Sequence, residues 1–250
     1  LLRFNDVTDH RMASLRSAFD KAIEDEDYQG SYEAVYPIKV NQQRSVCEQI
    51  RDAAARLGFG LEAGSKPELL AVLALTADEP RIPIVCNGFK DEEYIETVVL
   101  ASQIRERIYP IVERPGDLDL VIRIAQKHNI TPRIGVRIKP SARGMGRWQG
   151  SAGEAAKFGL TAAQLVEAVD KLRDADMLGS LQVVHFHIGS QVCDIISFKT
   201  AITELAWIYA EMRRMGAGVT HINVGGGLGV DYDGSRSATD SSVNYDLREY

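Results

Sequence analysis

Segments with the hydrophobic pattern of β-strands alternate with segments that have the pattern of α-helices along almost the whole chain. The strand-like segments are short runs of β-branched and aromatic residues, and the helix-like segments repeat apolar residues at spacings of three and four. Such regular alternation predicts an α/β fold with a parallel sheet and right-handed crossovers. We expect seven strands, of which the first ends at Lys39 and the others span 58–63, 82–87, 108–113, 133–139, 181–187 and 220–225.

A helix is expected between each pair of strands, and one amphipathic helix is expected before the first strand, at 8–27. The helices between strands are expected at 44–57, 66–76, 91–104, 117–128, 161–175 and 197–215, and a last one begins at 245–250. Seven strands suit either an open doubly wound sheet or a (β/α)8 barrel that lacks its last strand. No internal segment has the composition of a linker, so we expect one domain over residues 1–250.

The chain has 250 residues and a net charge of −6, without any run of basic residues. This balance disfavours a nucleic-acid partner, and no apolar run approaches the ~20 residues that a membrane span needs. No segment has the pattern of a signal peptide. The cysteines Cys47, Cys86 and Cys193 are far apart and are expected to be reduced thiols. We therefore expect a soluble cytoplasmic protein with no membrane partner.

The two ends of the chain and one internal loop carry further expectations. The chain starts at Leu1 and stops at Tyr250 inside an expected helix, so we expect a piece of a longer polypeptide. The Gly- and Ser-rich segment 140–156 is the one long irregular connection. Its residues Arg143, Arg147 and Trp148 could cover a bound ligand, and a surface loop without such a role is the alternative.

Lys39 ends the first expected strand on the same face as Val35 and Pro37. Side chains at the carboxyl ends of parallel strands point into the crevice where α/β proteins bind ligands. A lysine that is removed from water there is an amine that can form a Schiff base. A charge at the rim of the sheet is the commoner role of such a lysine, and the residue alone leaves both readings open.

His185 and His187 face the same side of the strand expected at 181–187. Two imidazoles at alternate strand positions can hold one zinc ion, as in metal-dependent barrel hydrolases. A pair of hydrogen-bonded core histidines is the alternative. No carboxylate or further histidine occupies a convincing ligand position, so metal is the least favoured role.

A glycine-rich run, Asn223 to Gly229, follows the last expected strand. Consecutive glycines such as Gly225, Gly226 and Gly227 let backbone N–H groups close around an anion without obstruction by side chains. Glycine clusters often only turn the chain, so the signal is weak by itself. The run also lies too late in the chain to be a dinucleotide fingerprint.

Arg137 faces inward beside Gly135 on the strand expected at 133–139. An unpaired charge in a protein interior is very costly, so a buried guanidinium requires a partner. Glu62 faces inward on its own strand and is the candidate. A structural ion pair of the interior is the less favoured alternative.

Several motifs in order along the chain carry a resemblance to one family. They are YPIKVNQQRSV (36–46), GFGLEAGSKPEL (58–69), VCNGFKDEEYI (85–95), KFGL (157–160), VVHFHIGSQ (183–191) and NVGGGLGVDYDGSRS (223–237). The core pattern tyrosine-x-x-lysine-x-asparagine resembles the lysine segment of the pyridoxal-phosphate-dependent decarboxylases of the alanine racemase-like barrel family. The extended form, with proline after the tyrosine, is similar to the biosynthetic arginine decarboxylases of that family.

The resemblance implies an incomplete (β/α)8 barrel whose last strand and C-terminal β domain lie outside these residues. It implies that Lys39 bears pyridoxal 5′-phosphate and that His187 stacks on its ring, with Glu62 and Arg137 under the ring. Cofactor contacts near the phosphate are implied for Ser190, Gly225, Gly226 and Gly227. Substrate binding is implied for the segment at about 223–233, with Asn223, Gly227, Leu228, Gly229, Asp231 and Tyr232.

The function that the resemblance implies is decarboxylation of L-arginine to agmatine for polyamine and spermidine biosynthesis. It also implies a magnesium requirement, which no ligand cluster in the sequence explains, and a homo-oligomer, either a dimer or a tetramer built from dimers. The alternatives are a decarboxylase of ornithine or diaminopimelate, a non-catalytic pyridoxal-phosphate-binding protein and a zinc hydrolase. We expect residues 1–250 alone to be inactive, because family active sites are completed by the second domain at a subunit interface.

Overall fold

The computed structural model describes residues 4–140 and 158–250. The segment 140–156, which was expected to carry the ligand-covering Arg143, Arg147 and Trp148, therefore lies outside the described residues except for Pro140. The chain divides into two compact units, Leu1–Pro110 and Ile111–Tyr250. Strands β1 to β4 are successive neighbours in the first unit and β4 to β7 in the second, since the boundary falls inside β4.

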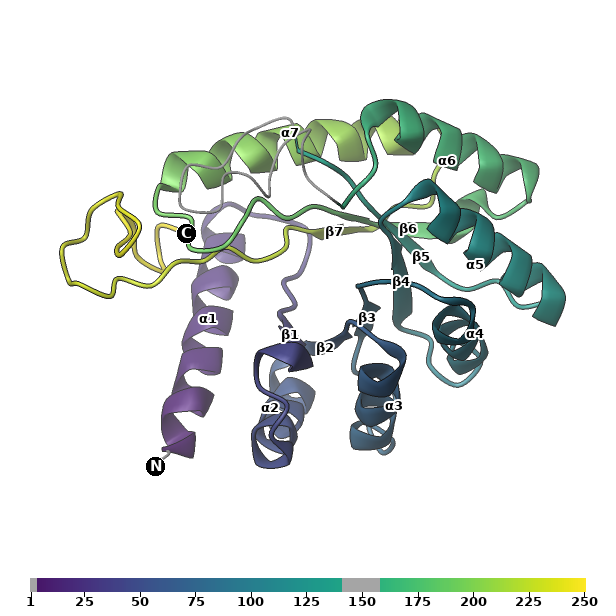
Figure 1. The fold of residues 1–250 in the computed structure, drawn as a ribbon. Helices are drawn as coiled ribbons and strands as arrows, with labels where there is room; N and C mark the ends of the chain where they lie inside the picture. The colour runs from purple at the N-terminus through teal and green to yellow at the C-terminus, as the bar shows by residue number, and fades with distance from the viewer. Residues whose placement is uncertain (1–3, 141–157) are drawn as a thin grey trace. The chain divides into compact units, whose positions relative to one another are not determined.

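The first unit alternates strands and helices from its first helix onward (Figure 1). Its strands are parallel, with Val35 opposite Gly60, Leu61 opposite Ile84, and Ile84 opposite Ile108. Its elements are α1 (Asn5–Asp25), β1 (Val35–Pro37), the 3₁₀ turn η1 (Ile38–Val40), α2 (Arg44–Leu57), β2 (Gly60–Ala63), α3 (Lys66–Leu75), β3 (Ile84–Cys86), α4 (Glu92–Ala101) and the start of β4 (Ile108–Val112).

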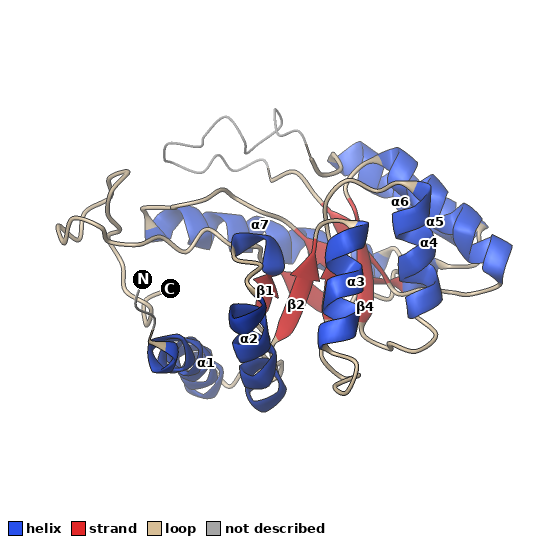
Figure 2. Ribbon diagram, turned by 60° about the horizontal axis from the view of Figure 1, so that its bottom comes forward, coloured by secondary structure: helices blue, strands red, loops and turns tan. Residues whose placement is uncertain are grey.

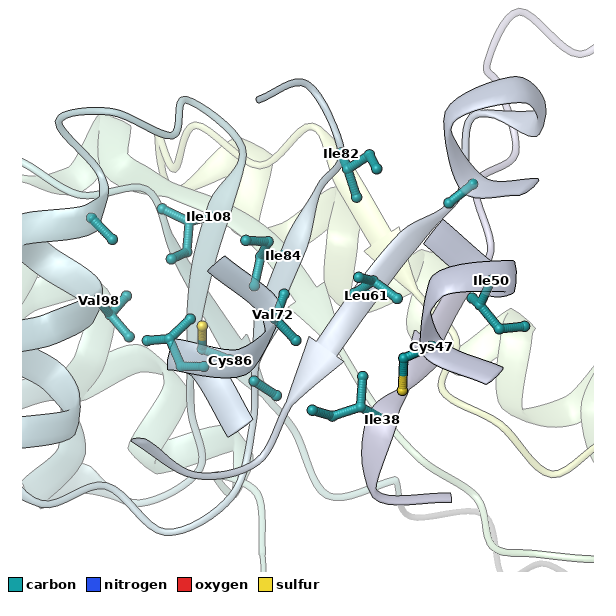
Figure 3. Close-up of a cluster of buried hydrophobic side chains, with 14 of the residues drawn as sticks. Ile38, Cys47, Ile50, Leu61, Val72, Ile82, Ile84, Cys86, Val98 and Ile108 are labelled. Carbon is teal, nitrogen blue, oxygen red and sulfur yellow. The ribbon is translucent and has the colours of Figure 1, made fainter. Parts of the chain in front are cut away.

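A cluster of buried hydrophobic side chains joins the sheet of this unit to its helices (Figure 3). Cys47 and Ile50 of α2 and Val72 of α3 pack with Leu61 of β2 and Ile84 of β3. The spacing of three between Cys47 and Ile50 places both on one face of α2. Burial of these apolar surfaces is the main force that holds helices and strands together. The ends of β1 to β3 are thereby fixed relative to one another.

The second unit repeats the pattern with parallel strands. Ile111 lies opposite Gly135, Arg137 opposite His185, and His185 opposite Asn223. Helices α5 and α6 lie side by side in both views (Figures 1 and 2). Its elements are α5 (Pro115–His128), β5 (Ile134–Arg137), α6 (Ala162–Asp174), the 3₁₀ turn η3 (Leu178–Ser180), β6 (Leu181–His185), α7 (Ile195–Arg214) and β7 (His221–Asn223).

Local sequence signals set several helix ends. Thr161 accepts a hydrogen bond from the N–H of Gln164, and the Gln164 side chain accepts one from Thr161, which forms a capping box at the start of α6. Asp194 caps α7 by accepting from the N–H of Ile196. Gly58 ends α2 with a left-handed φ of 69°, a conformation that glycine adopts without steric cost.

The seven strands and the helices between them occur where the hydrophobic pattern predicted them, which confirms the parallel α/β architecture. Most of the expected bounds differ from the observed ones by one to three residues, two of them at strand ends next to site residues, and one expected helix did not form. The first strand ends at Pro37, two residues before Lys39, and the sixth ends at His185 instead of 187. The last expected helix, 245–250, is a turn, in which the Tyr250 N–H donates to the Asp246 carbonyl at 3.0 Å. Among residues 4–140 and 158–250, no helix combines the length and the apolar character needed to cross a membrane.

Candidate active site

Lys39 lies in the turn η1, directly after β1. Ile38 is buried in the hydrophobic cluster, and this anchor turns the chain out of the strand and leaves the Lys39 side chain 60% exposed. The prediction that Lys39 ends a strand and is removed from water is therefore wrong in detail. The lysine still follows a strand at its carboxyl end, which is where parallel α/β folds place ligand-binding side chains.

Glu62 is the partner of Lys39. Pro37 lies opposite Glu62 in the register of β1 and β2, so the chain that continues from Pro37 into η1 passes the Glu62 carboxylate. Lys39 Nζ donates to Glu62 Oε1 at 3.3 Å, and the Glu62 side chain is only 15% exposed. The structure thus brings together two of the residues that were predicted to contact one cofactor, and it gives the lysine a nearby proton acceptor.

Glu68 braces the segment that follows Lys39, a role that the sequence analysis missed. One oxygen of its carboxylate accepts from the Gln42 side chain at 2.7 Å, and the other accepts from the Gly64 N–H at 2.7 Å. The segment after η1 is thereby tied to the turn after β2. The available signal was the Ser65-x-x-Glu68 spacing, which is typical of a capping box at a helix start.

In the second unit, Arg137 at the end of β5 pairs with Glu113, which follows β4. Arg137 Nη1 lies 2.7 Å from Glu113 Oε1, and the two side chains are 20% and 4% exposed. The Arg137 guanidinium also lies over the ring of Phe158, 5.7 Å from its centroid. Glu113 therefore replaces Glu62, which we predicted as the partner of Arg137, because the register of β4 and β5 brings Glu113 beside the end of β5.

His185 is buried at the end of β6 and makes a hydrogen bond from its Nδ1 to the Asn223 carbonyl at 3.1 Å. Burial, followed by the nearby positive charge of Arg137, lowers the pKa of His185 to about 3. A neutral ring with its Nδ1 proton directed at a carbonyl is the arrangement of a core histidine. Within the described residues, no group of three or more His, Cys, Asp or Glu side chains could hold a metal ion, so the zinc alternative finds no support there.

His187 is half-buried and lies two residues beyond β6. Its Nδ1 accepts a hydrogen bond from the Gly189 N–H at 3.0 Å, so the proton of the neutral ring belongs on Nε2. The Nε2 atom lies 3.8 Å from the point where a side chain on Gly226 would begin. The structure therefore brings His187 next to the glycine run, as it must if these residues contact the same cofactor.

The glycines fold against the segment that carries His187. Gly225 and Gly227 have φ angles of +70° and +115°, and a Cβ would approach Phe186 O to 2.5 Å at Gly225 and Gly189 O to 2.8 Å at Gly227. Only glycine fits such contacts. The Gly225 N–H donates to Asn223 Oδ1 at 2.9 Å, so that donor is already engaged. These three residues, Gly225 to Gly227, form a glycine cradle whose backbone a phosphate group can approach without obstruction by side chains.

The segment after the glycines is held by backbone and side-chain contacts. Leu228 forms a parallel bridge with Val192, and Tyr245, which the sequence analysis missed, accepts from the Gly229 N–H at 2.9 Å. Asp231 Oδ1 accepts from Gly234 N and from the Ser242 hydroxyl, so this carboxylate shapes the loop. Besides Lys39, three residues predicted to contact cofactor or substrate have exposed side chains, namely Ser190, Leu228 and Tyr232.

Relatives of known name match the whole chain. A biosynthetic arginine decarboxylase of Rhodopirellula baltica is 51% identical over 250 residues, which are 100% of this chain and 37% of that protein. One of Tolumonas auensis is 51% identical over 251 residues and is matched over 39% of its length. The chain thus spans about two fifths of the length of these relatives.

Solved structures give the same picture. The biosynthetic arginine decarboxylase of Campylobacter jejuni has a TM-score of 0.87 and 35% identity, over 99% of this chain and 40% of that one. A diaminopimelate decarboxylase from M. jannaschii has a TM-score of 0.73 at 23% identity, over 93% of this chain and 53% of that one, and shares the fold. These matches confirm the predicted barrel class over the open-sheet alternative. Residues 12–250 match the family model described as "Pyridoxal-dependent decarboxylase, pyridoxal binding domain", and the chain belongs to this family.

Proposed function

We propose that this chain is the pyridoxal-phosphate-binding part of an arginine decarboxylase, which converts L-arginine to agmatine and carbon dioxide in polyamine and spermidine biosynthesis. The observation that carries the proposal is identity of about one residue in two over the full chain with relatives named biosynthetic arginine decarboxylase. The hydrogen bond from Lys39 to Glu62 also supports the proposal, because it places a proton acceptor beside the lysine that would bind the cofactor. The diaminopimelate decarboxylases are under 25% identical and support the fold alone.

When bound, pyridoxal phosphate supplies an aldehyde that condenses with amines and a ring that accepts the electron pair released as carbon dioxide leaves. Lys39 is the proposed attachment point. An ammonium must lose a proton before its nitrogen can attack an aldehyde, and Glu62 Oε1, 3.3 Å from Lys39 Nζ, is placed to take that proton. The protonated Glu62 carboxyl then holds that proton and can donate a hydrogen bond to the amine nitrogen, which orients the amine.

The other proposed cofactor contacts are residues of the second unit. The N–H groups of Gly226 and Gly227 and the hydroxyl of Ser190 are the proposed phosphate donors, and Gly225 shapes the turn. His187 is proposed to pack on the ring, with its orientation set by the hydrogen bond from Gly189. Arg137, which pairs with Glu113, adds a positive charge. These roles follow the family resemblance, and the glycine geometry supports them.

Substrate binding is proposed for the segment from Asn223 to Tyr232. Asp231 holds the loop through Gly234 and Ser242, which leaves Leu228, Gly229 and the exposed Tyr232 as the proposed contacts with an amino acid. The net charge of −6 suits a cationic substrate such as arginine.

The experiment is an assay of the full-length protein with arginine, ornithine and diaminopimelate as substrates, with the products separated by chromatography. We expect agmatine from arginine and at most traces of putrescine and lysine from the others. Putrescine or lysine as the main product would replace the proposal by a sibling decarboxylase. A protein that shows the visible absorption of bound pyridoxal phosphate and turns over none of the three would be a non-catalytic binder.

The family resemblance adds a magnesium requirement, a homo-oligomer and a cytoplasmic location to the proposal. Magnesium is tested by dialysis against EDTA, after which activity should fall and return with Mg²⁺ but not with Zn²⁺. Activity that survives the chelator removes magnesium from the proposal. Light scattering of the full-length protein should give the mass of a dimer or of a multiple of it.

A further inference from the structure

Four polar side chains lie at one level across neighbouring strands of the second unit. Val112 lies opposite Val136, so Glu113 and Arg137 follow at the same level. Arg137 is then opposite His185, and His185 is opposite Asn223. The row ends at the glycine cradle, because Asn223 Oδ1 holds the Gly225 N–H. Roles have been given above to Arg137, His185 and Asn223. Glu113 has been described only as the ion-pair partner of Arg137.

Glu113 is a buried carboxylate whose backbone is held on both sides. Its N–H donates to Asp117 Oδ2 at 3.1 Å, and its carbonyl accepts from the Gly159 N–H at 3.0 Å. A carboxylate that is 4% exposed is costly in a folded chain unless it is paired. Its side chain is therefore a fixed point against which Arg137 can be oriented.

Arg137 is less buried than Glu113 and reaches the end of its strand. Glu113 fixes one edge of the guanidinium at 2.7 Å, and the ring of Phe158 lies along its face. The neighbouring His185 does not compete for the carboxylate, since its Nδ1 is committed to the Asn223 carbonyl. The guanidinium is thus held by one carboxylate contact and by the ring of Phe158.

We propose that Glu113 is a positioning residue of the cofactor site, which acts on cofactor affinity by holding the Arg137 guanidinium in place. The inference rests on the proposed function, because it assumes that the site binds pyridoxal phosphate. It goes beyond that function by assigning a role to a residue outside the motifs that carry the family resemblance. A purely structural ion pair is the competing explanation.

The test is a double-mutant cycle in the full-length protein, with Glu113→Gln, Arg137→Gln and the combined variant. Glu113→Gln leaves the half-buried Arg137 guanidinium without its carboxylate and lowers the melting temperature, whereas the combined variant removes both charges and regains most of that loss. The dissociation constant for pyridoxal phosphate is measured on each apoprotein by absorbance titration. Glu167→Gln, an exposed charge change on α6, is the matched control.

We expect Glu113→Gln and Arg137→Gln each to weaken cofactor binding by about tenfold or more, in the range seen for residues that orient ligand-binding groups. The combined variant should bind no more weakly than Arg137→Gln and should not recover affinity when it recovers stability. Affinity that returns together with stability shows a structural pair and overturns the proposal. The proposal is also overturned if the fold-changes in dissociation constant of the two single variants multiply in the combined variant.

Glu113→Asp keeps the negative charge but has a side chain that is shorter by one methylene. This variant replaces Glu113→Gln in the test if Glu113→Gln does not fold. We expect its affinity to lie between those of the wild type and Arg137→Gln, and wild-type affinity overturns the inference. If the wild-type protein itself binds no pyridoxal phosphate, the proposed function has failed. If the wild type binds and Glu113→Gln binds equally well, only the role of Glu113 has failed.

Discussion

At the scale of single residues, the role of each charged side chain depends on its ion-pair partner. Lys39 and Arg137 are the two cations of the candidate site that the sequence singled out, and each has its own carboxylate, Glu62 and Glu113. The sequence analysis found three of these four residues but assigned Glu62 to Arg137. The assignment failed because pairing depends on strand register, which a hydrophobic pattern of period two does not determine across strands.

Replacement of Glu62 tests the proton acceptor for Lys39. In Glu62→Gln the amide cannot take a proton from Lys39 Nζ, so we expect arginine decarboxylation by the full-length protein to fall by about a hundredfold, the lower end for general acid–base groups. Glu48→Gln, which removes a carboxylate from an ion pair with Arg44 on α2, is the control and should keep its activity. Equal activity of the two variants would remove Glu62 from the chemistry.

The buried His185 predicts a pH dependence of stability. Its pKa is lowered from 6.5 to about 3 in the folded chain, so the unfolded chain binds the proton first as the pH falls. Below pH 6.5 this residue therefore lowers the free energy of unfolding by up to about 1.4 kcal/mol per pH unit, a loss that ends near pH 3. At higher pH the effect is absent. Denaturant unfolding of the wild type and His185→Asn between pH 7 and pH 4 measures the difference, and parallel curves would contradict a buried neutral histidine.

At the scale of elements, the candidate site residues lie at the ends of the strands, and these ends are the positions that hydrophobic patterns predict least accurately. Alternation located β1, but Ile38 packs into the hydrophobic cluster, so the strand stops at Pro37 and Lys39 is exposed on a turn. The pattern could not reveal this, because a buried Ile38 satisfies strand and turn alike. Glu113 was missed as a partner of Arg137, although the strand expected at 108–113 included it as its last residue; in the structure β4 ends at Val112 and Glu113 follows it.

The glycine run gives a prediction for a whole element. Gly225→Ala places a Cβ 2.5 Å from Phe186 O at a φ of +70°, so the turn between β7 and the following loop must shift. We expect a loss of unfolding free energy of about 1–3 kcal/mol and weaker binding of pyridoxal phosphate. Gly116→Ala on α5 is the matched control, since no atom lies within 4 Å of its Cβ position, and it should be neutral or slightly stabilising. Equal unfolding curves for both variants would show that the cradle does not require glycine at 225.

At the scale of the whole molecule, the chain matches about two fifths of the length of its named relatives. The repeated strand and helix pattern was enough to predict the α/β architecture, and the ordered motifs were enough to predict the family. Side-chain selectivity could not be predicted in this way, because the resemblance implies that family active sites are completed by residues of the second domain. We therefore expect residues 1–250 alone to bind pyridoxal phosphate weakly and to release no measurable carbon dioxide from arginine. Turnover by this segment at the rate of the full-length protein would refute that expectation.

The central claim is that Lys39 carries the cofactor. The full-length protein is reduced with borohydride in the presence of pyridoxal phosphate, digested, and mapped by mass spectrometry. Lys66, the first residue of α3, is the internal control, because it also follows a strand and pairs with a carboxylate, Glu93. We predict loss of the visible absorption on reduction and one stable pyridoxyl adduct, on Lys39. An adduct on another lysine, or none, would contradict the account.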